Sequence, residues 1–201
     1  MRLNQRIGHV VLRMMVMSAM GLLLWACGSG GGGGGGGQPP QNPLTASFVP
    51  VTTNPGDNSV SMQQNIAEST VDTVALDVVA NDVTRGKVFG VVFDLGFDPN
   101  HTNQVEFVRY TKGQFLETTS NQVAYLVEPQ QNDPRVLVVG ISQLAPDPGA
   151  DGSGVSGVIV TLYFKALNLG DAVLTFKNLN LIDPSDQAIN VTPYAGKIEV
   201  K

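Results

Sequence analysis

The stretch Lys87-Val88-Phe89-Gly90-Val91-Val92-Phe93-Asp94-Leu95-Gly96-Phe97 decides the fold class of this chain. Large apolar side chains occupy every second position from Phe89 to Phe97, and Gly90, Asp94 and Gly96 are among the residues between them. A period of two places successive side chains on opposite faces of a β-strand. The stretch therefore predicts a strand over residues 87–97 with one face in a core and the other facing outward.

The rest of the chain beyond residue 45 shows the same alternation, and no stretch of useful length has the 3.6-residue period of a helix. Residues 135–142 are apolar on both faces, which predicts a strand in the middle of a sheet. A glycine-led stretch at 157–167 predicts a strand with a bend near its start. The other predicted strands cover residues 59–66, 73–79, 104–110, 122–127, 172–181 and 196–200.

Turn-forming residues separate these stretches, because Asn and Asp accept local backbone hydrogen bonds, Pro fixes φ and Gly allows positive φ. They lie at 81–82, 98–100, 129–134, 146–149, 168–171 and 183–186. Many short strands with turns at this spacing predict two packed antiparallel sheets. We therefore predict an all-β fold, an antiparallel two-sheet sandwich of the jelly-roll type with about nine strands, formed by residues 46–201 as one domain.

The N-terminal residues have the layout of an export signal. Three arginines and no acidic residue precede the apolar residues 14–26, and a glycine tract follows. The apolar part is shorter than the roughly 20 residues that span a membrane. We predict that residues 1–26 are a cleaved signal and that residues 27–45, rich in glycine and then in proline, form a flexible tether.

Leu24-Trp25-Ala26-Cys27 resembles the lipobox of bacterial lipoproteins. This resemblance implies that Cys27, the single cysteine of the chain, is acylated and becomes the mature N-terminus. Trp25 departs from the pattern because a smaller residue usually stands there, and an ordinary cleaved signal remains the alternative. The absence of aspartate directly after Cys27 resembles lipoproteins of an outer membrane, so we expect a lipid-anchored protein of the cell envelope, at the outer membrane or cell surface.

Charge excludes one class of partner. The chain has 12 basic and 17 acidic residues, and removing the three arginines of residues 1–26 leaves nine against 17, a net charge of −8. Nucleic-acid-binding proteins need a basic surface that displaces counterions from phosphates, and an acidic domain lacks one. The acidic domain is equally unsuited to electrostatic binding of anionic lipid, so membrane contact is expected through the lipid anchor alone.

Five blocks resemble, in order, the cohesin domain of cellulosome scaffoldins, which belongs to a sandwich superfamily that also contains carbohydrate-binding modules. Their inward aromatic side chains and Asp-Pro turn also have plain structural causes. The blocks are Val74-Ala75-Leu76-Asp77-Val78, Phe93-Asp94-Leu95-Gly96-Phe97-Asp98-Pro99-Asn100, the long strand from Gly157 to Ala166, Val173-Leu174-Thr175-Phe176 after Gly170, and Gly196-Lys197-Ile198-Glu199-Val200.

The resemblance implies a partner, the dockerin, a small calcium-binding helical module that docks on a sheet face. In cohesins this face includes the strand before the Asp-Pro turn and the long glycine-led strand. The corresponding outward residues of this chain are Val88, Gly90, Val92, Asp94, Thr161, Tyr163 and Lys165. The first three lack polar side chains, so the strip is either a partner site or a surface covered by residues 46–51 or by a loop.

The sequence has no recognisable set of catalytic residues, so we predict a non-catalytic protein without a cofactor. His101 is the single histidine after the signal, and no Gly-x-Ser-x-Gly motif occurs. Asp147 with Asp151, and Asp183 with Asp186, favour acidic turns over calcium sites because neither pair has EF-hand spacing.

We therefore predict a lipid-anchored extracytoplasmic binding module of cohesin type that holds a protein partner. One alternative is a carbohydrate-binding module of polysaccharide catabolism, although the predicted mature chain has no tryptophan and Tyr163 is its one confidently outward tyrosine. The other alternative is a structural spacer in an envelope assembly.

Overall fold

The all-β prediction is confirmed by the computed structural model, which describes residues 43–97, 102–117, 122–144 and 148–201. Cys27, most of the predicted tether and His101 lie outside these residues. None of the described residues forms a helix long and apolar enough to cross a membrane. The strands are β1 (Ala46–Pro50), β2 (Ser59–Gln64), β3 (Thr73–Val88), β4 (Gly90–Phe97), β5 (Val105–Lys112), β6 (Val123–Gln130), β7 (Asp133–Gln143), β8 (Ala150–Ala166), β9 (Gly170–Ile182), β10 (Ala188–Ile189), β11 (Thr192–Tyr194) and β12 (Gly196–Val200).

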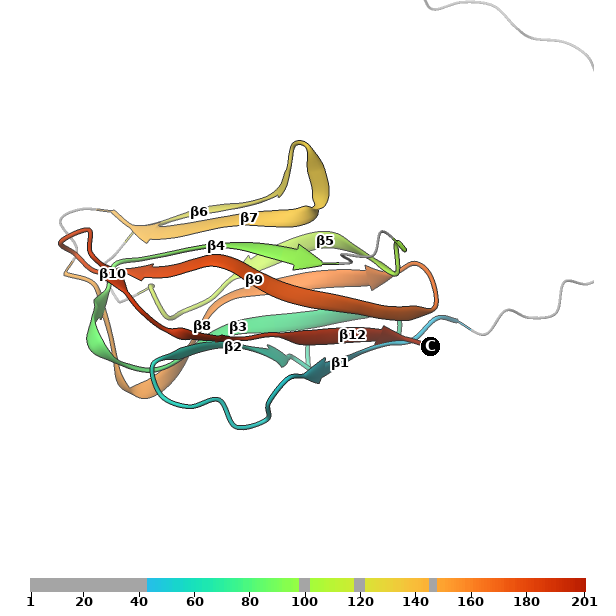
Figure 1. The fold of residues 1–201 in the computed structure, drawn as a ribbon, viewed down its shortest axis with the longest axis horizontal. Helices are drawn as coiled ribbons and strands as arrows, with labels where there is room; N and C mark the ends of the chain where they lie inside the picture. Colours follow the sequence, from blue (N-terminus) through green and yellow to red (C-terminus); the bar gives the residue numbers. More distant parts are fainter. Residues whose placement is uncertain (1–42, 98–101, 118–121, 145–147) are drawn as a thin grey trace, which may run out of the picture. The chain divides into compact units, whose positions relative to one another are not determined.

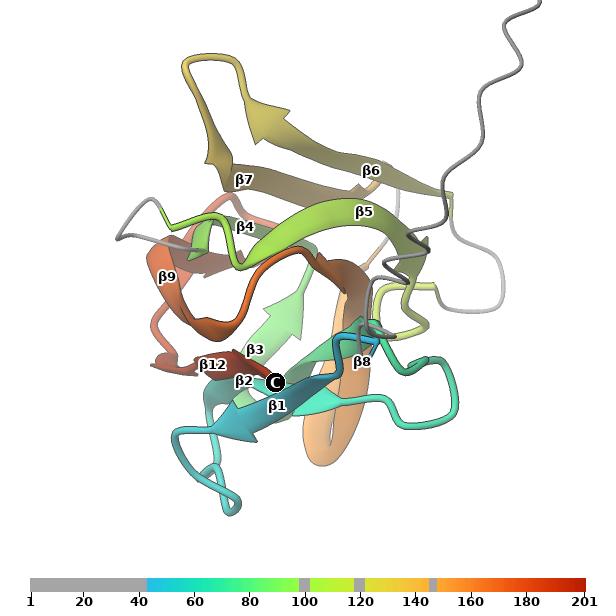
Figure 2. The same cartoon turned by 90° about the vertical axis from the view of Figure 1, so that its right-hand side faces the viewer.

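The strands form the two sheets of a sandwich (Figures 1 and 2). The seven-stranded sheet has the order β1-β12-β9-β4-β7-β6, with β10 paired to β9, and the five-stranded sheet has the order β11-β2-β3-β8-β5. Neighbouring strands are antiparallel apart from β11 and β2, which run parallel. The predicted sandwich is therefore confirmed, with more strands than the nine expected because the short strands β1, β10 and β11 lack a clear alternation.

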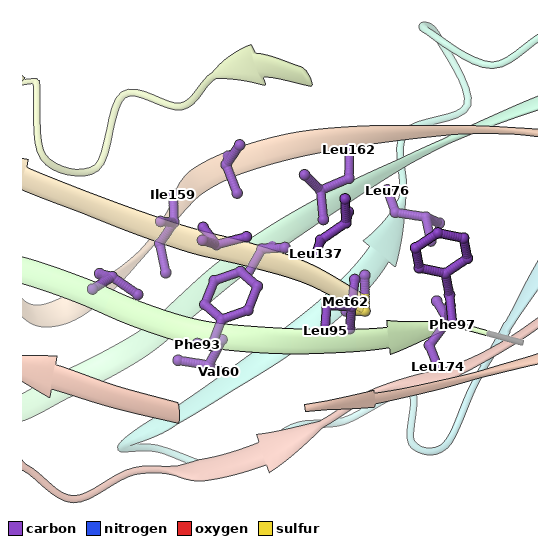
Figure 3. Close-up of a cluster of buried hydrophobic side chains, with 14 of the residues drawn as sticks. Val60, Met62, Leu76, Phe93, Leu95, Phe97, Leu137, Ile159, Leu162 and Leu174 are labelled. Atoms are coloured by element: carbon purple, nitrogen blue, oxygen red, sulfur yellow. The ribbon is translucent and has the colours of Figure 1, made fainter. Parts of the chain in front are cut away.

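The core lies between the sheets and is filled by the predicted alternating side chains (Figure 3). Phe93, Leu95 and Phe97 of β4 point inward and are at most 3% exposed. Phe97 packs edge-on against Phe164 of β8 with ring centroids 5.2 Å apart, which joins the two sheets at an aromatic contact.

The predicted strand 87–97 begins differently from expectation. Val88 is the last residue of β3 in the five-stranded sheet, and Gly90 is the first residue of β4 in the other sheet. The chain changes sheets at Phe89, so the alternation of β4 does not extend back through it. Val88 is consequently fully buried and Phe89 is partly exposed, the reverse of the expected pattern.

Two further differences concern β3 and β8. Asn81 and Asp82 were expected in a turn, but they lie within β3, where the register with β8 shifts between Asn81 and Val83. Asp82 has φ of 37°, and the side chain of Asn81 donates hydrogen bonds to Ser59 and Ser61 of β2. Side-chain hydrogen bonds to the neighbouring strand β2 thus accommodate a bulge without ending the strand. The bulge or bend expected near Gly157 is confirmed by another register shift, between Val78 and Val79 of β3, which lie opposite Val160 and Val158 of β8.

Candidate partner-binding surfaces

The outer face of the seven-stranded sheet has an apolar centre. Val92 of β4 is 36% exposed, and its register neighbours are Gly140 of β7 and Asn180 of β9. Leu126 of β6, opposite Gly140, is 48% exposed. A Cβ atom added at Gly140 would meet one atom within 4 Å, the Leu126 Cβ at 3.9 Å. Space above Gly140 is therefore free, and another chain can approach the sheet backbone there.

Polar side chains flank this apolar centre. Asp94 of β4 accepts a hydrogen bond of 2.7 Å from the Asn178 side chain and lies in register with Lys177 of β9. Thr175 and Lys177 are exposed on β9, and Glu128 is exposed on β6. An apolar centre with a polar rim is the usual composition of a protein–protein interface. We call Val92, Asp94, Leu126, Gly140 and Lys177 the open face.

The outer face of the five-stranded sheet is closed by its own side chains. Tyr163 of β8 is 2% exposed, because the guanidinium carbon of Arg109 lies 3.5 Å from its ring centroid. The Tyr163 hydroxyl donates to Glu68 Oε2 at 2.8 Å and lies 3.3 Å from the Thr111 hydroxyl. The ring is therefore covered and its hydroxyl is engaged.

A second set of hydrogen bonds continues this network along the same face. Thr161, 6% exposed, donates to Asp77 Oδ1 at 2.6 Å. The Asn65 side chain donates to both carboxylate oxygens of Asp77 at 3.3 Å. Asn65 and Glu68 belong to the loop between β2 and β3, so the network holds that loop onto the sheet. We call Asn65, Glu68, Asp77, Arg109, Thr111, Thr161 and Tyr163 the closed face.

The predicted partner residues do not form one surface. The strand before the Asp-Pro turn (β4) and the glycine-led strand (β8) lie in different sheets, so their outward side chains lie on opposite faces of the sandwich. Val88 and Gly90 are buried, and Thr161 and Tyr163 lie within the closed face. Val92 and Asp94 belong to the open face, whereas Lys165 is exposed beside the closed face.

Residues 46–51 do not cover the strip, because β1 extends the seven-stranded sheet by pairing with β12 at its edge. Prediction of the open face also missed Gly140, Leu126 and Lys177. Gly140 could have been found, since it shares the outward register of Val136 and Val138 within the predicted strand 135–142.

Charged side chains pair along β12, which lies next to the edge strand β1. Lys197 Nζ lies 2.7 Å from Asp171 Oδ2 and 2.9 Å from Glu199 Oε1, and Lys201 lies 2.9 Å from Glu199 Oε2. Hydrogen bonds that Lys197 donates to Asp171 and then to Glu199 raise the pKa of Lys197 to about 12. Hydrogen bonds from Lys201 and then Lys197 lower the pKa of Glu199 to about 2.

No group of three His, Cys, Asp or Glu side chains that could hold a metal ion occurs among the described residues. The Asp183 carboxylate accepts from the backbone N–H groups of Ser185 and Gln187, both at 2.8 Å, as expected of a turn. Asp147 lies outside the described residues.

Two cohesins from Acetivibrio cellulolyticus are similar to this chain in structure. A type II cohesin domain from the cellulosome matches with a TM-score of 0.54 and 13% identity, covering 72% of this chain and 95% of the cohesin. A type II cohesin in a cohesin–X-dockerin complex matches with a TM-score of 0.52 and 13% identity, covering 69% and 96%. No family model and no curated protein matches the chain. At these identities the likeness shows the fold, and this chain has the cohesin fold.

Proposed function

We propose that this protein is a non-catalytic binding module of cohesin type that holds a dockerin-bearing protein at the cell envelope. The observation that carries the proposal is the open face, where Val92 and Leu126 are exposed around a glycine with free space above it. The cohesin fold supports the choice of partner, because one of the similar cohesins is part of a cohesin–X-dockerin complex.

Three properties of the open face suit a helical partner. Val92 and Leu126 provide apolar contact area, and Gly140 allows a helix to approach the sheet closely. Asp94 and Lys177 offer one charge of each sign at the flank of β4 and β9, which can fix the partner's orientation. The closed face lacks these properties because its polar groups are already hydrogen-bonded to one another.

Gly140→Arg tests the proposal. The arginine side chain would project into the space that the partner has to occupy, so we expect loss of binding with little change in stability. The purified protein is titrated by calorimetry with recombinant dockerin modules from the same genome. Gly140→Ala is the matched control, because its Cβ fits beside Leu126. Dockerin binding that survives Gly140→Arg would place the partner elsewhere, and failure of every dockerin to bind would refute the partner class.

Lipid attachment at Cys27 is a separate part of the proposal. It is supported by the lipobox-like Leu24-Trp25-Ala26-Cys27 and by the glycine tract that follows. Cys27→Ser should move the protein from the membrane fraction to the soluble fraction of the parent cell. Unchanged fractionation would show that another feature anchors the protein.

A further inference from the structure

An apolar groove of about 530 Å³ lies on the seven-stranded sheet, away from Gly140 and Leu126. It forms between β9 on one side and the paired strands β1 and β12 on the other. Val49 and Val173 are 39% and 40% exposed at its walls, and Val51 is 69% exposed at its rim. Pro50, Leu174, Phe176 and Ala195 add to its apolar lining.

The groove exists because the chain after β10 leaves β9. Strand β10 pairs with β9 at Leu181 and Ile182, and β12 pairs with it from Gly170 to Val173. Between them β11 crosses to the five-stranded sheet and pairs with β2. Figure 1 shows β9 with β4 along one side and β12 along the other.

Part of β9 therefore has a free edge. Within the described part of the chain, no strand pairs with residues 174–177 on the side that faces β12 and β10, and this extended stretch ends at Asn178, where φ is 53°. Backbone N–H and C=O groups on an unpaired edge bond readily to an added strand. The groove thus combines an apolar lining with unpaired strand backbone, and this combination fits an extended peptide better than a compact ligand.

The charge of the groove indicates a neutral occupant. Lys197 is the one charged residue of its lining, and its ammonium group is already held by Asp171 and Glu199. No charge at the groove is left without a partner of opposite sign. A segment of alternating apolar side chains would place one row in the groove while its backbone bonds to β9.

The N-terminal residues of this chain are unsuited to the groove. Val49 lies about 20 Å along the chain from Pro43, whereas Pro39 and Pro40 can reach back only about 10–14 Å from Pro43. The residues that could reach further, 30–37, are all glycine and have no side chains to fill an apolar groove. Residues 27–29 are Cys, Gly and Ser, and the apolar residues 14–26 belong to the signal that is predicted to be cleaved, so we expect the occupant to come from another molecule.

We propose that this groove binds an extended, uncharged, apolar peptide segment of a partner protein, which pairs with the free edge of β9 as an added strand. This site is distinct from the open face. The two sites allow the protein to hold one partner on the sheet surface while a second segment lies in the groove.

A random peptide library displayed on phage is selected on the full-length protein and counter-selected on Val173→Asp. We expect enriched peptides with alternating apolar residues, whose affinity falls about tenfold or more with Val173→Asp and with Val49→Asp. Circular dichroism and thermal melting confirm that both variants are folded. Gly140→Arg should leave peptide binding unchanged, which separates this site from the open face.

Backbone pairing is tested with N-methylated versions of a selected peptide. Methyl groups on alternate amides facing β9 should reduce affinity about tenfold, whereas methyl groups on the other amides should have little effect. The proposal is overturned if no enriched peptide depends on Val173 and Val49, or if both methylation patterns reduce affinity equally.

Discussion

The closed face and the open face belong to the same sandwich, yet outward side chains are covered on the closed face and exposed on the open face. On the closed face Tyr163 and Thr161 point away from the core but are 2% and 6% exposed, because Arg109 and the loop that carries Asn65 and Glu68 cover them. On the open face Val92 and Leu126 point outward and stay exposed. An outward side chain is therefore not the same as an accessible one.

The largest expected difference between the two faces is in stability. Tyr163→Ala should lower the free energy of unfolding by about 4 kcal/mol, since it removes a buried ring and leaves Glu68 without its hydrogen bond. Val92→Ala on the open face should cost less than about 0.5 kcal/mol. Urea denaturation of both variants measures this. Equal losses of unfolding free energy would show that the two faces do not differ in stability. Tyr163→Phe removes the hydroxyl alone and should lower the free energy of unfolding by about 1 kcal/mol.

Two glycines sharpen the comparison. A Cβ atom at Gly113, directly after β5, would clash with the Val158 carbonyl oxygen, so the backbone must move to accept it. Gly113→Ala should cost about 3 kcal/mol, whereas Gly140→Ala should stay within about 0.5 kcal/mol. Thermal melts of the two variants provide the measurement. A small loss of stability in Gly113→Ala would show that the backbone at the end of β5 can shift to accept the added methyl group.

Arg109→Ala should partly convert the closed face into an accessible one. Removing the guanidinium uncovers the Tyr163 ring and should cost about 1 kcal/mol. Hydrogen exchange of the loop at residues 65–72 should also accelerate, because the contacts around Tyr163 and Glu68 loosen. Arg109→Lys keeps the charge but loses the planar contact, so an intermediate effect is expected. Unchanged hydrogen exchange in the loop would show that the hydrogen bonds between Asn65 and Asp77, and not the contacts around Tyr163, hold the loop in place.

The smallest expected effect is electrostatic and lies on β12. The pKa of Glu199 is lowered to about 2, so its ion pairs stabilise the fold above pH 4.5 and this contribution is lost as pH falls toward 2. The pKa of Lys197 is raised to about 12, so its contribution is present below pH 10.5 and is lost above it. These groups are partly exposed, so solvent screens their interactions.

Glu199→Gln should therefore lower the Tm at pH 6 by less than about 2 °C, and the difference from the unmodified protein should vanish near pH 2. High salt should reduce the difference at pH 6 as well. A difference of the same size at both pH values would show that packing of Glu199, and not its charge, matters.

Alternation predicted the fold class and the inward side chains well, as Phe93, Leu95 and Phe97 show. It could not predict which strands share a sheet, because sheet order depends on tertiary pairing that no local pattern records. That limit explains why Val92 and Tyr163 were placed on one surface, although β4 and β8 lie in different sheets.

Two other failures have causes that lie outside the local sequence. Asn81-Asp82 is a strong turn signal, but hydrogen bonds from Asn81 to Ser59 and Ser61 keep the segment within β3 as a bulge. The closed face depends on a loop 65–72 folding back onto the sheet, which follows from contacts with Asp77 and Tyr163 that are far apart in sequence.

The pairing of β1 with β12 has a mechanical consequence. Thr45 and Lys201 exchange backbone hydrogen bonds of 2.8 and 3.0 Å, and β1 runs antiparallel to β12 from there. Tension that separates these two ends opens the ladder one bond at a time. A pull on Thr45 along β1, opposed by a load bound to the sheet, instead loads the Ala46–Pro50 ladder in shear, so that its bonds resist together. The direction of pulling, and not only its strength, decides how firmly this domain resists force.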